Sequence, residues 1–176
     1  EENADVSCRC PTILPEVKTW GATQASEQNQ LEALWLHQAV DVVEPKLLEQ
    51  LLNAKDGKVR AAAVRVLAFW QQRSPANAPW QGWPTAPLPL ARAEISAAKS
   101  LDLLAKSVAD DHPRVRLEAV RALARIPTAQ AAELALSAMN KPLDEKLEYA
   151  LWLTVNDLAE PWLAALKSGA WKFEGR

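Results

Sequence analysis

The chain has 176 residues, the size of a single domain and enough to bury a hydrophobic core without disulfides or metal ions. Apolar residues make up 49%, charged residues 24%, and the formal net charge is −2. This balance gives no electrostatic attraction to nucleic acid or to an anionic membrane. No apolar run approaches the roughly 18 residues that span a bilayer. We therefore expect neither nucleic-acid binding nor membrane insertion.

Residues 1–25 are interpreted as a partly ordered N-terminal tail. The segment is acidic and lacks the basic start and apolar stretch of a signal peptide, so the signal of an exported protein would lie outside this sequence. Its two cysteines, Cys8 and Cys10, are one residue apart. They lack the further ligands of a metal site and the spacing of a haem attachment motif, and a disulfide between them would be strained. We interpret them as two thiols.

The first predicted unit covers residues 26–54 and consists of two helices, the second starting at Pro45. His37 stands where the later units carry leucine, at Leu67, Leu123 and Leu153. Those leucines are predicted core residues, so His37 is predicted to point inward. We expect a buried histidine that hydrogen-bonds to a backbone carbonyl or to Gln38. The alternative is contact with a ligand or with a neighbouring domain.

The second predicted unit covers residues 57–109 and contains an insertion at 74–91. Its first helix carries an apolar stripe at helical spacing: Val59, Ala63, Val64, Leu67 and Trp70. The insertion holds five prolines together with Trp80 and Trp83. Aromatic side chains on a constrained loop are candidate contacts for a ligand or partner. Alternatively, the loop folds back and its indoles pack on the helices.

The third and fourth predicted units cover residues 113–140 and 142–169. The third repeats the stripe of the second, at Val115, Ala119, Val120, Leu123 and Ile126. Trp162 is expected to cover the end of the stack. The other tryptophans within predicted helices are interpreted as core residues: Trp35, Trp70 and Trp152. Three residues are predicted to cap the helices that follow them: Asp56, Asp111 and Thr128.

Four similar segments set the repeat register. They begin at Leu31, Ala61, Leu117 and Leu147, and their starts are 30, 56 and 30 residues apart. The longer spacing places the insertion inside the second unit rather than between two domains. No segment alternates like a strand for more than a few residues. Because a helix pair cannot bury both faces alone, we predict an all-α fold in which about four helix pairs stack into an α-solenoid. A four-helix bundle with extra helices is the alternative.

The stretch DDHPRVRLEAVRALARI, residues 110–126, resembles a HEAT repeat of the armadillo type: an acidic turn, a proline, Val-Arg and an alanine-rich helix. A weaker copy is KDGKVRAAAVRVLAFW, residues 55–70. Residues 30–70 and 145–169 are similar to the HEAT segment of PVC-type haem-binding or membrane-bound-dehydrogenase-like bacterial proteins. The resemblance implies an excised part of a larger exported protein, periplasmic or extracellular, whose redox chemistry lies in other domains.

The resemblance also implies a role for two equivalent arginines, Arg60 and Arg116. In HEAT repeats the arginine after the acidic turn typically pairs with an acidic residue of an adjacent unit, which makes Asp56 and Asp111 the candidate partners. Arg65 and Arg121 are equivalent to each other as well. The alternative interpretation of these arginines is a basic ridge that binds an anionic partner.

No motif in the sequence indicates catalysis. The chain has no G-x-S-x-G motif, no glycine-rich phosphate loop and no paired metal-ligating histidines. We expect no enzyme activity, no metal site and no cofactor in this chain. The predicted function is a non-catalytic scaffold or interaction module for other domains of a parent protein or for a protein partner. The alternative is a glycan- or small-molecule-binding module that uses Trp80, Trp83 and His37.

Overall fold

The computed structural model describes residues 10–40, 42–72 and 95–171. Within these ranges the chain forms nine α-helices and no strand, which confirms the all-α prediction. The α-helices and one short 3-10 turn are α1 (Cys10–Thr23), α2 (Glu27–Ala39), α3 (Pro45–Leu52), α4 (Gly57–Gln72), α5 (Ala97–Val108), α6 (Pro113–Leu123), α7 (Ala129–Leu136), η2 (Ser137–Asn140), α8 (Glu145–Asp157) and α9 (Ala159–Lys167).

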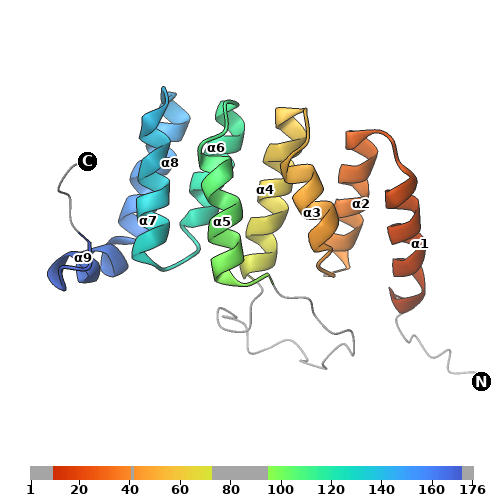
Figure 1. The fold of residues 1–176 in the computed structure, drawn as a ribbon, viewed down its shortest axis with the longest axis horizontal. Coiled ribbons are helices and arrows are strands. Elements are labelled where there is room, and N and C mark those ends of the chain that lie inside the picture. Colours follow the sequence, from red (N-terminus) through yellow and green to blue (C-terminus); the bar gives the residue numbers. More distant parts are fainter. Residues whose placement is uncertain (1–9, 41, 73–94, 172–176) are drawn as a thin grey trace, which may run out of the picture.

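The helices lie in two layers (Figure 1). One layer is the row of first helices, α2, α4, α6 and α8, in which each helix packs on the next. The second helices α3, α5 and α7 lie in front of this row in Figure 1. Helix α1 packs on α2 at one end of the row, and α9 packs on α7 and α8 at the other.

Short side chains and prolines fix where the helices begin. Thr128 accepts a hydrogen bond from the N–H of Ala131, and Asp56 accepts one from the N–H of Lys58. Both therefore cap the helices predicted for them. Pro45 and Pro113 occupy first-turn positions, where a missing N–H leaves no partner unsatisfied.

The cap of α6 differs from the prediction. His112, not Asp111, is the N-cap residue, and its Nδ1 accepts a hydrogen bond from the N–H of Arg114 at 3.2 Å. The N–H of His112 itself donates to Asp110 Oδ1 at 2.8 Å. Pro113 holds the preceding residue in the extended conformation, so the cap falls on His112.

The core follows the row of first helices. Helices α4 and α6 lie between two neighbours and bury residues on both flanks, whereas α8 at the end of the row buries only Leu147, Ala150, Leu151 and Thr154. Leu67 and Leu123 are fully buried, but the equivalent Leu153 is 37% exposed. The assignment of Leu153 to the core was therefore wrong, because no further helix among the described residues covers that side of α8.

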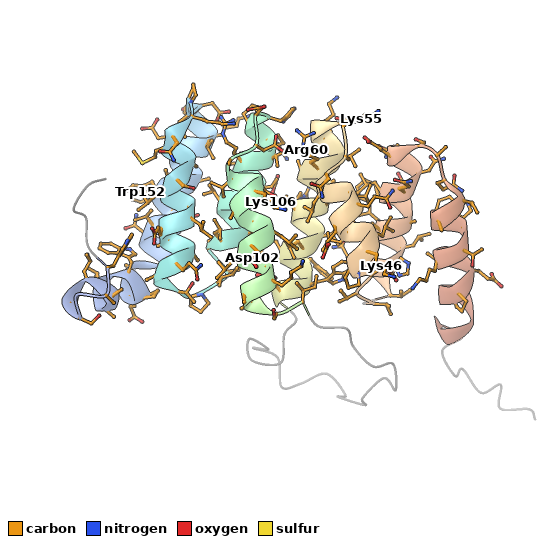
Figure 2. All side chains as sticks on the ribbon, in the orientation of Figure 1. Lys46, Lys55, Arg60, Asp102, Lys106 and Trp152 are labelled. Carbon is orange, nitrogen blue, oxygen red and sulfur yellow. The ribbon has the colours of Figure 1, made fainter. Side chains whose placement is uncertain are left out.

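Two of the three tryptophans assigned to the core are exposed. Trp70 is buried, as predicted, but Trp35 is 39% exposed and Trp152 is 61% exposed, so their assignment to the core was wrong. Figure 2 places Trp152 on α8 at the end of the row. Tyr149 stacks on Trp152 with ring centroids 6.2 Å apart. Trp162 is half-buried against the core, and its Nε1–H donates to the carbonyl of Val155 at 3.0 Å.

Two of the features singled out in the sequence lie outside the described residues. The insertion at 74–91, with Trp80 and Trp83, and Cys8 lie outside the described ranges, while Cys10 is the first residue of α1. None of the described helices is long and apolar enough to cross a membrane. In the same ranges, no three His, Cys, Asp or Glu residues lie close enough together to hold a metal ion.

Candidate functional site: an arginine groove on the first helices

A groove of about 380 Å³ lies across three first helices. We call it the arginine groove. Helix α2 contributes Trp35 and Gln38, α4 contributes most of the floor, and α6 with the residues just after it contributes a cluster of charge. Its lining residues are Trp35, Gln38, Ala62, Arg65, Val66, Ala68, Phe69, Glu118, Arg121 and Arg125.

The repeat register builds this groove. Trp35, Arg65 and Arg121 are equivalent residues of three successive units, 30 and 56 residues apart. Phe69 and Arg125, also 56 residues apart, are equivalent one turn further along the helices. Because α2, α4 and α6 pack side by side, equivalent side chains lie next to one another across the row. A single position of the repeat thus lines the groove three times.

The lining of the groove carries more positive than negative charge. Its only lining carboxylate, Glu118, is 4% exposed and is engaged twice: by Arg114 Nε at 3.1 Å and by an Arg121 terminal nitrogen at 3.3 Å. Arg65 and Arg125 have no ion pair or hydrogen bond with any described residue. Among the described residues, the groove therefore presents two guanidinium groups without an ion pair and a third that shares its carboxylate.

Arg125 lies where its positive charge is disfavoured. Partial desolvation lowers the pKa of Arg125, the positive charge of Arg121 lowers it further, and Glu118 acts in the opposite direction. The net effect shows that the surroundings disfavour the positive charge at this position. An anion placed in the groove would relieve that repulsion.

His37 is a core residue and does not line the groove. It is buried as predicted, at 3% exposed, but neither ring nitrogen has a hydrogen-bond partner among the described residues. The expected bond to a carbonyl or to Gln38 is absent. Burial lowers the pKa of His37, with Glu44 raising it and Lys18 lowering it to smaller extents. His37 is therefore held in its neutral form inside the first unit.

Arg60 joins two units through Asp110, which was not one of its predicted partners. Its Nε and a terminal nitrogen donate to both oxygens of Asp110, at 2.7 and 2.8 Å. The predicted partners Asp56 and Asp111 make other contacts: Asp56 caps α4, and Asp111 is fully exposed and pairs with Lys141. Asp110 is the partner because the chain turns it inward at the joint, where it also accepts the N–H of His112.

Arg116 repeats the arrangement without a carboxylate. Arg60 donates to the carbonyls of Ala54 and Lys55, and Arg116 donates to the equivalent carbonyls of Asp110 and Asp111. A further bond from Arg116 reaches the carbonyl of Pro142 in the next unit at 2.7 Å. Each arginine therefore binds two carbonyls of the turn that precedes its own helix and ties its unit to the next. Arg60 lies at that joint in Figure 2.

With this geometry established, the chain was compared with known proteins. It matches no family model, no curated protein and no solved structure.

A basic ridge that includes Arg65 and Arg121 was the alternative interpretation of the sequence, but Trp35 and Arg125 were not joined to it. Arg65 and Arg121 were recognised as equivalent, whereas Trp35 was assigned to the core. The signal was the repeat position itself, which holds tryptophan in one unit and arginine in the next two. A position that stays large and polar or amphipathic in successive units faces away from the core.

Proposed function

We propose that this chain is a HEAT-like α-solenoid with a non-catalytic role: it binds a protein partner, or another domain of a larger parent chain, on the face formed by its first helices. The observation that carries this proposal is the arginine groove, which spans three successive units at one repeat position. Stacked helical repeats provide continuous binding surfaces in this way, because equivalent residues of neighbouring units lie side by side.

The joints between units support the HEAT-like assignment. Arg60 and Arg116 occupy equivalent positions after the turn, bind equivalent carbonyls and reach into the next unit. The proposed parent is an exported haem-binding or dehydrogenase-like protein, periplasmic or extracellular. This part of the proposal rests on the resemblance of residues 30–70 and 145–169 to such proteins. The redox groups would lie in other domains.

The chemistry of the groove favours binding over catalysis. Its lining carboxylate, Glu118, is buried and engaged by two arginines, Arg114 and Arg121. The remaining lining residues are cationic, aromatic, amide or aliphatic. Arginine and tryptophan are the side chains that contribute most binding energy at protein interfaces.

Site-specific photo-cross-linking tests the proposed function. One protein carries p-benzoylphenylalanine in place of Trp35 in the groove, and a control carries it in place of Lys106, an exposed residue of α5 in the other layer. Each is irradiated in an extract of the source cells. We expect discrete cross-linked proteins from position 35 alone, lost when excess unmodified chain competes. Equal products from both positions, or none from position 35, would overturn the proposal.

A further inference from the structure

The charges and walls of the arginine groove indicate the chemistry of its partner. We propose that the groove binds an acidic protein segment, a short run of Asp or Glu residues that also carries an aromatic or aliphatic side chain. This inference rests on the proposed function and specifies the class of partner.

The charge of the groove is complementary to that of an acidic segment. Arg65 and Arg125 have no acidic partner among the described residues, and Arg121 shares Glu118 with Arg114. A guanidinium presents its N–H groups in a planar fork that matches the two oxygens of a carboxylate. Carboxylates arriving from a partner would supply the acceptors that the groove lacks, in a chain whose overall charge is negative.

The groove also has an apolar part, which would bind an apolar side chain of the partner. Trp35, 39% exposed, lies beside the arginines; partly buried Ala62 adds some aliphatic surface, and the buried Val66 and Ala68 form the floor beneath it. Charge attraction alone would not require the partly exposed indole of Trp35. An apolar side chain of the partner that covered Trp35 would remove this surface from water and fix the position of the neighbouring carboxylates.

The carboxylates on either side of the groove favour an acidic peptide over a nucleic acid as the partner. Glu32 on α2 and Glu148 on α8 are exposed, and both occupy the repeat position of Glu118. Carboxylates therefore stand on the helices at either side of the arginines. A long phosphate backbone laid across the row from α2 to α8 would meet both of these charges, whereas a short segment bound by Arg65, Arg121 and Arg125 needs to cover only α4 and the end of α6, which lie between them.

Fluorescence polarisation with defined probes tests the inference. The probe is a fluorescein-labelled heptapeptide, Glu-Asp-Trp-Glu-Glu-Leu-Asp, and the comparisons are its Gln/Asn counterpart and a labelled single-stranded oligonucleotide. The wild-type chain should bind the acidic peptide about tenfold or more tightly than the amide peptide, with affinity falling as salt rises. Equal affinity for the two peptides, or tighter binding of the oligonucleotide, would overturn the inference.

Matched charge-loss variants locate the binding. Arg65→Gln/Arg125→Gln and Lys46→Gln/Lys106→Gln each remove two exposed cations, the first pair from the groove and the second from α3 and α5 in the other layer (Figure 2). The groove variant should lose about tenfold in affinity for the acidic peptide, and the control should retain it. Thermal unfolding checks that both variants fold.

Retained affinity in the groove variant, or an equal loss in both variants, would refute the site. The two proposals fail separately. If position 35 still cross-links a protein while the acidic peptide does not bind, the interaction function stands and the acidic partner is excluded. If the peptide binds but cross-linking yields nothing, the recognition chemistry stands and the protein-partner function falls.

Discussion

At the residue scale, His37 shows how one side chain can make stability depend on pH. Its ring is buried in the first unit without a hydrogen-bond partner among the described residues. The equivalent residues Leu67 and Leu123 are fully buried leucines, so the fold accepts an apolar side chain at this position. The histidine therefore carries the cost of a buried polar group, about 1–3 kcal/mol.

We predict that His37→Leu stabilises the chain, and more so in acid. Burial lowers the pKa of His37 below its ordinary value of 6.5, so the unfolded chain takes up the proton first as pH falls. The wild-type chain should thus lose stability as pH drops through 6.5, and the leucine variant should not. Urea denaturation should show a gain of about 1 kcal/mol at pH 7.5 and a larger gain at pH 5.

His37→Gln serves as the control, because it keeps a buried polar group but cannot take up the proton. It should lose the pH dependence without gaining stability at pH 7.5. If His37→Leu kept the wild-type dependence between pH 7.5 and 5, burial of the neutral imidazole would not be its source.

Asp110 gives a second prediction at this scale. Burial raises the pKa of Asp110, but hydrogen bonds from Arg60 and from the N–H of His112 outweigh it and hold the pKa below 3.8. Its stabilising contribution is therefore present at neutral pH and lost as pH falls below that value. Asp110→Asn should lower the free energy of unfolding at pH 7 by about 2 kcal/mol, since Arg60 loses its charged partner.

Asp111→Asn is the matched control, one residue along the same turn. Asp111 is fully exposed, so solvent screens its pair with Lys141 and the change should be small. The assignment of Asp110 as the joint residue would be refuted if the two variants lost stability equally in urea denaturation.

At the element scale, the start of α4 is set by its contact with α6. A Cβ atom on Gly57 would lie 2.4 Å from Cδ2 and 2.6 Å from Cγ of His112. The imidazole cannot easily move away, because it caps α6 through its bond to the N–H of Arg114. Glycine is thus required here by the close approach of two units rather than by an unusual backbone angle.

We predict that Gly57→Ala destabilises the chain by about 1–3 kcal/mol because of this overlap. Helix propensity alone predicts the opposite, a gain of up to about 1 kcal/mol. The double variant Gly57→Ala/His112→Ser should recover most of the loss, since serine removes the ring but keeps a side-chain cap. Thermal and urea unfolding measure both effects.

Lys58→Ala controls for the change to alanine in the same turn, and its effect should be close to zero. A stabilising Gly57→Ala, or a double variant no better than the single one, would contradict the packing explanation.

At the scale of the whole molecule, stability should be highest in the middle of the row. Helices α4 and α6 have neighbours on both sides, whereas α1 packs on α2 at one end and α9 has no fully buried residue. In a stack of helix pairs each unit is stabilised mainly by its own contacts and those with the next unit. The terminal helices therefore have fewer contacts to lose when they open.

Hydrogen exchange checks this prediction. Amides of α4 and α6 should exchange slowest, and those of α1 and α9 about 100-fold faster or more, because local opening of the ends costs less than opening of the middle. Equal protection of all helices would show a single cooperative unit, and slower exchange in α9 than in α6 would reverse the proposed gradient.

The sequence by itself determined the all-α class, the approximate extent of the helices after residue 25 and the apolar stripes of the middle units, but Cys10–Thr23, interpreted as part of the tail, forms α1. These features depend on helical periodicity and on local caps such as Thr128, both of which neighbouring residues along the chain decide. The tertiary structure alone decided that Trp35 and Trp152 are exposed, that Asp110 rather than Asp111 pairs with Arg60, and that Trp35 and three arginines form one groove. Trp35 shares the exposed repeat position of Arg65 and Arg121, and Asp110 reaches Arg60 only once α4 and α6 have packed together. For Trp152 the physical reason is that the burial of a helix face depends on how many helices pack beside it. That number changes from the middle of the row to its ends, although the repeat pattern does not.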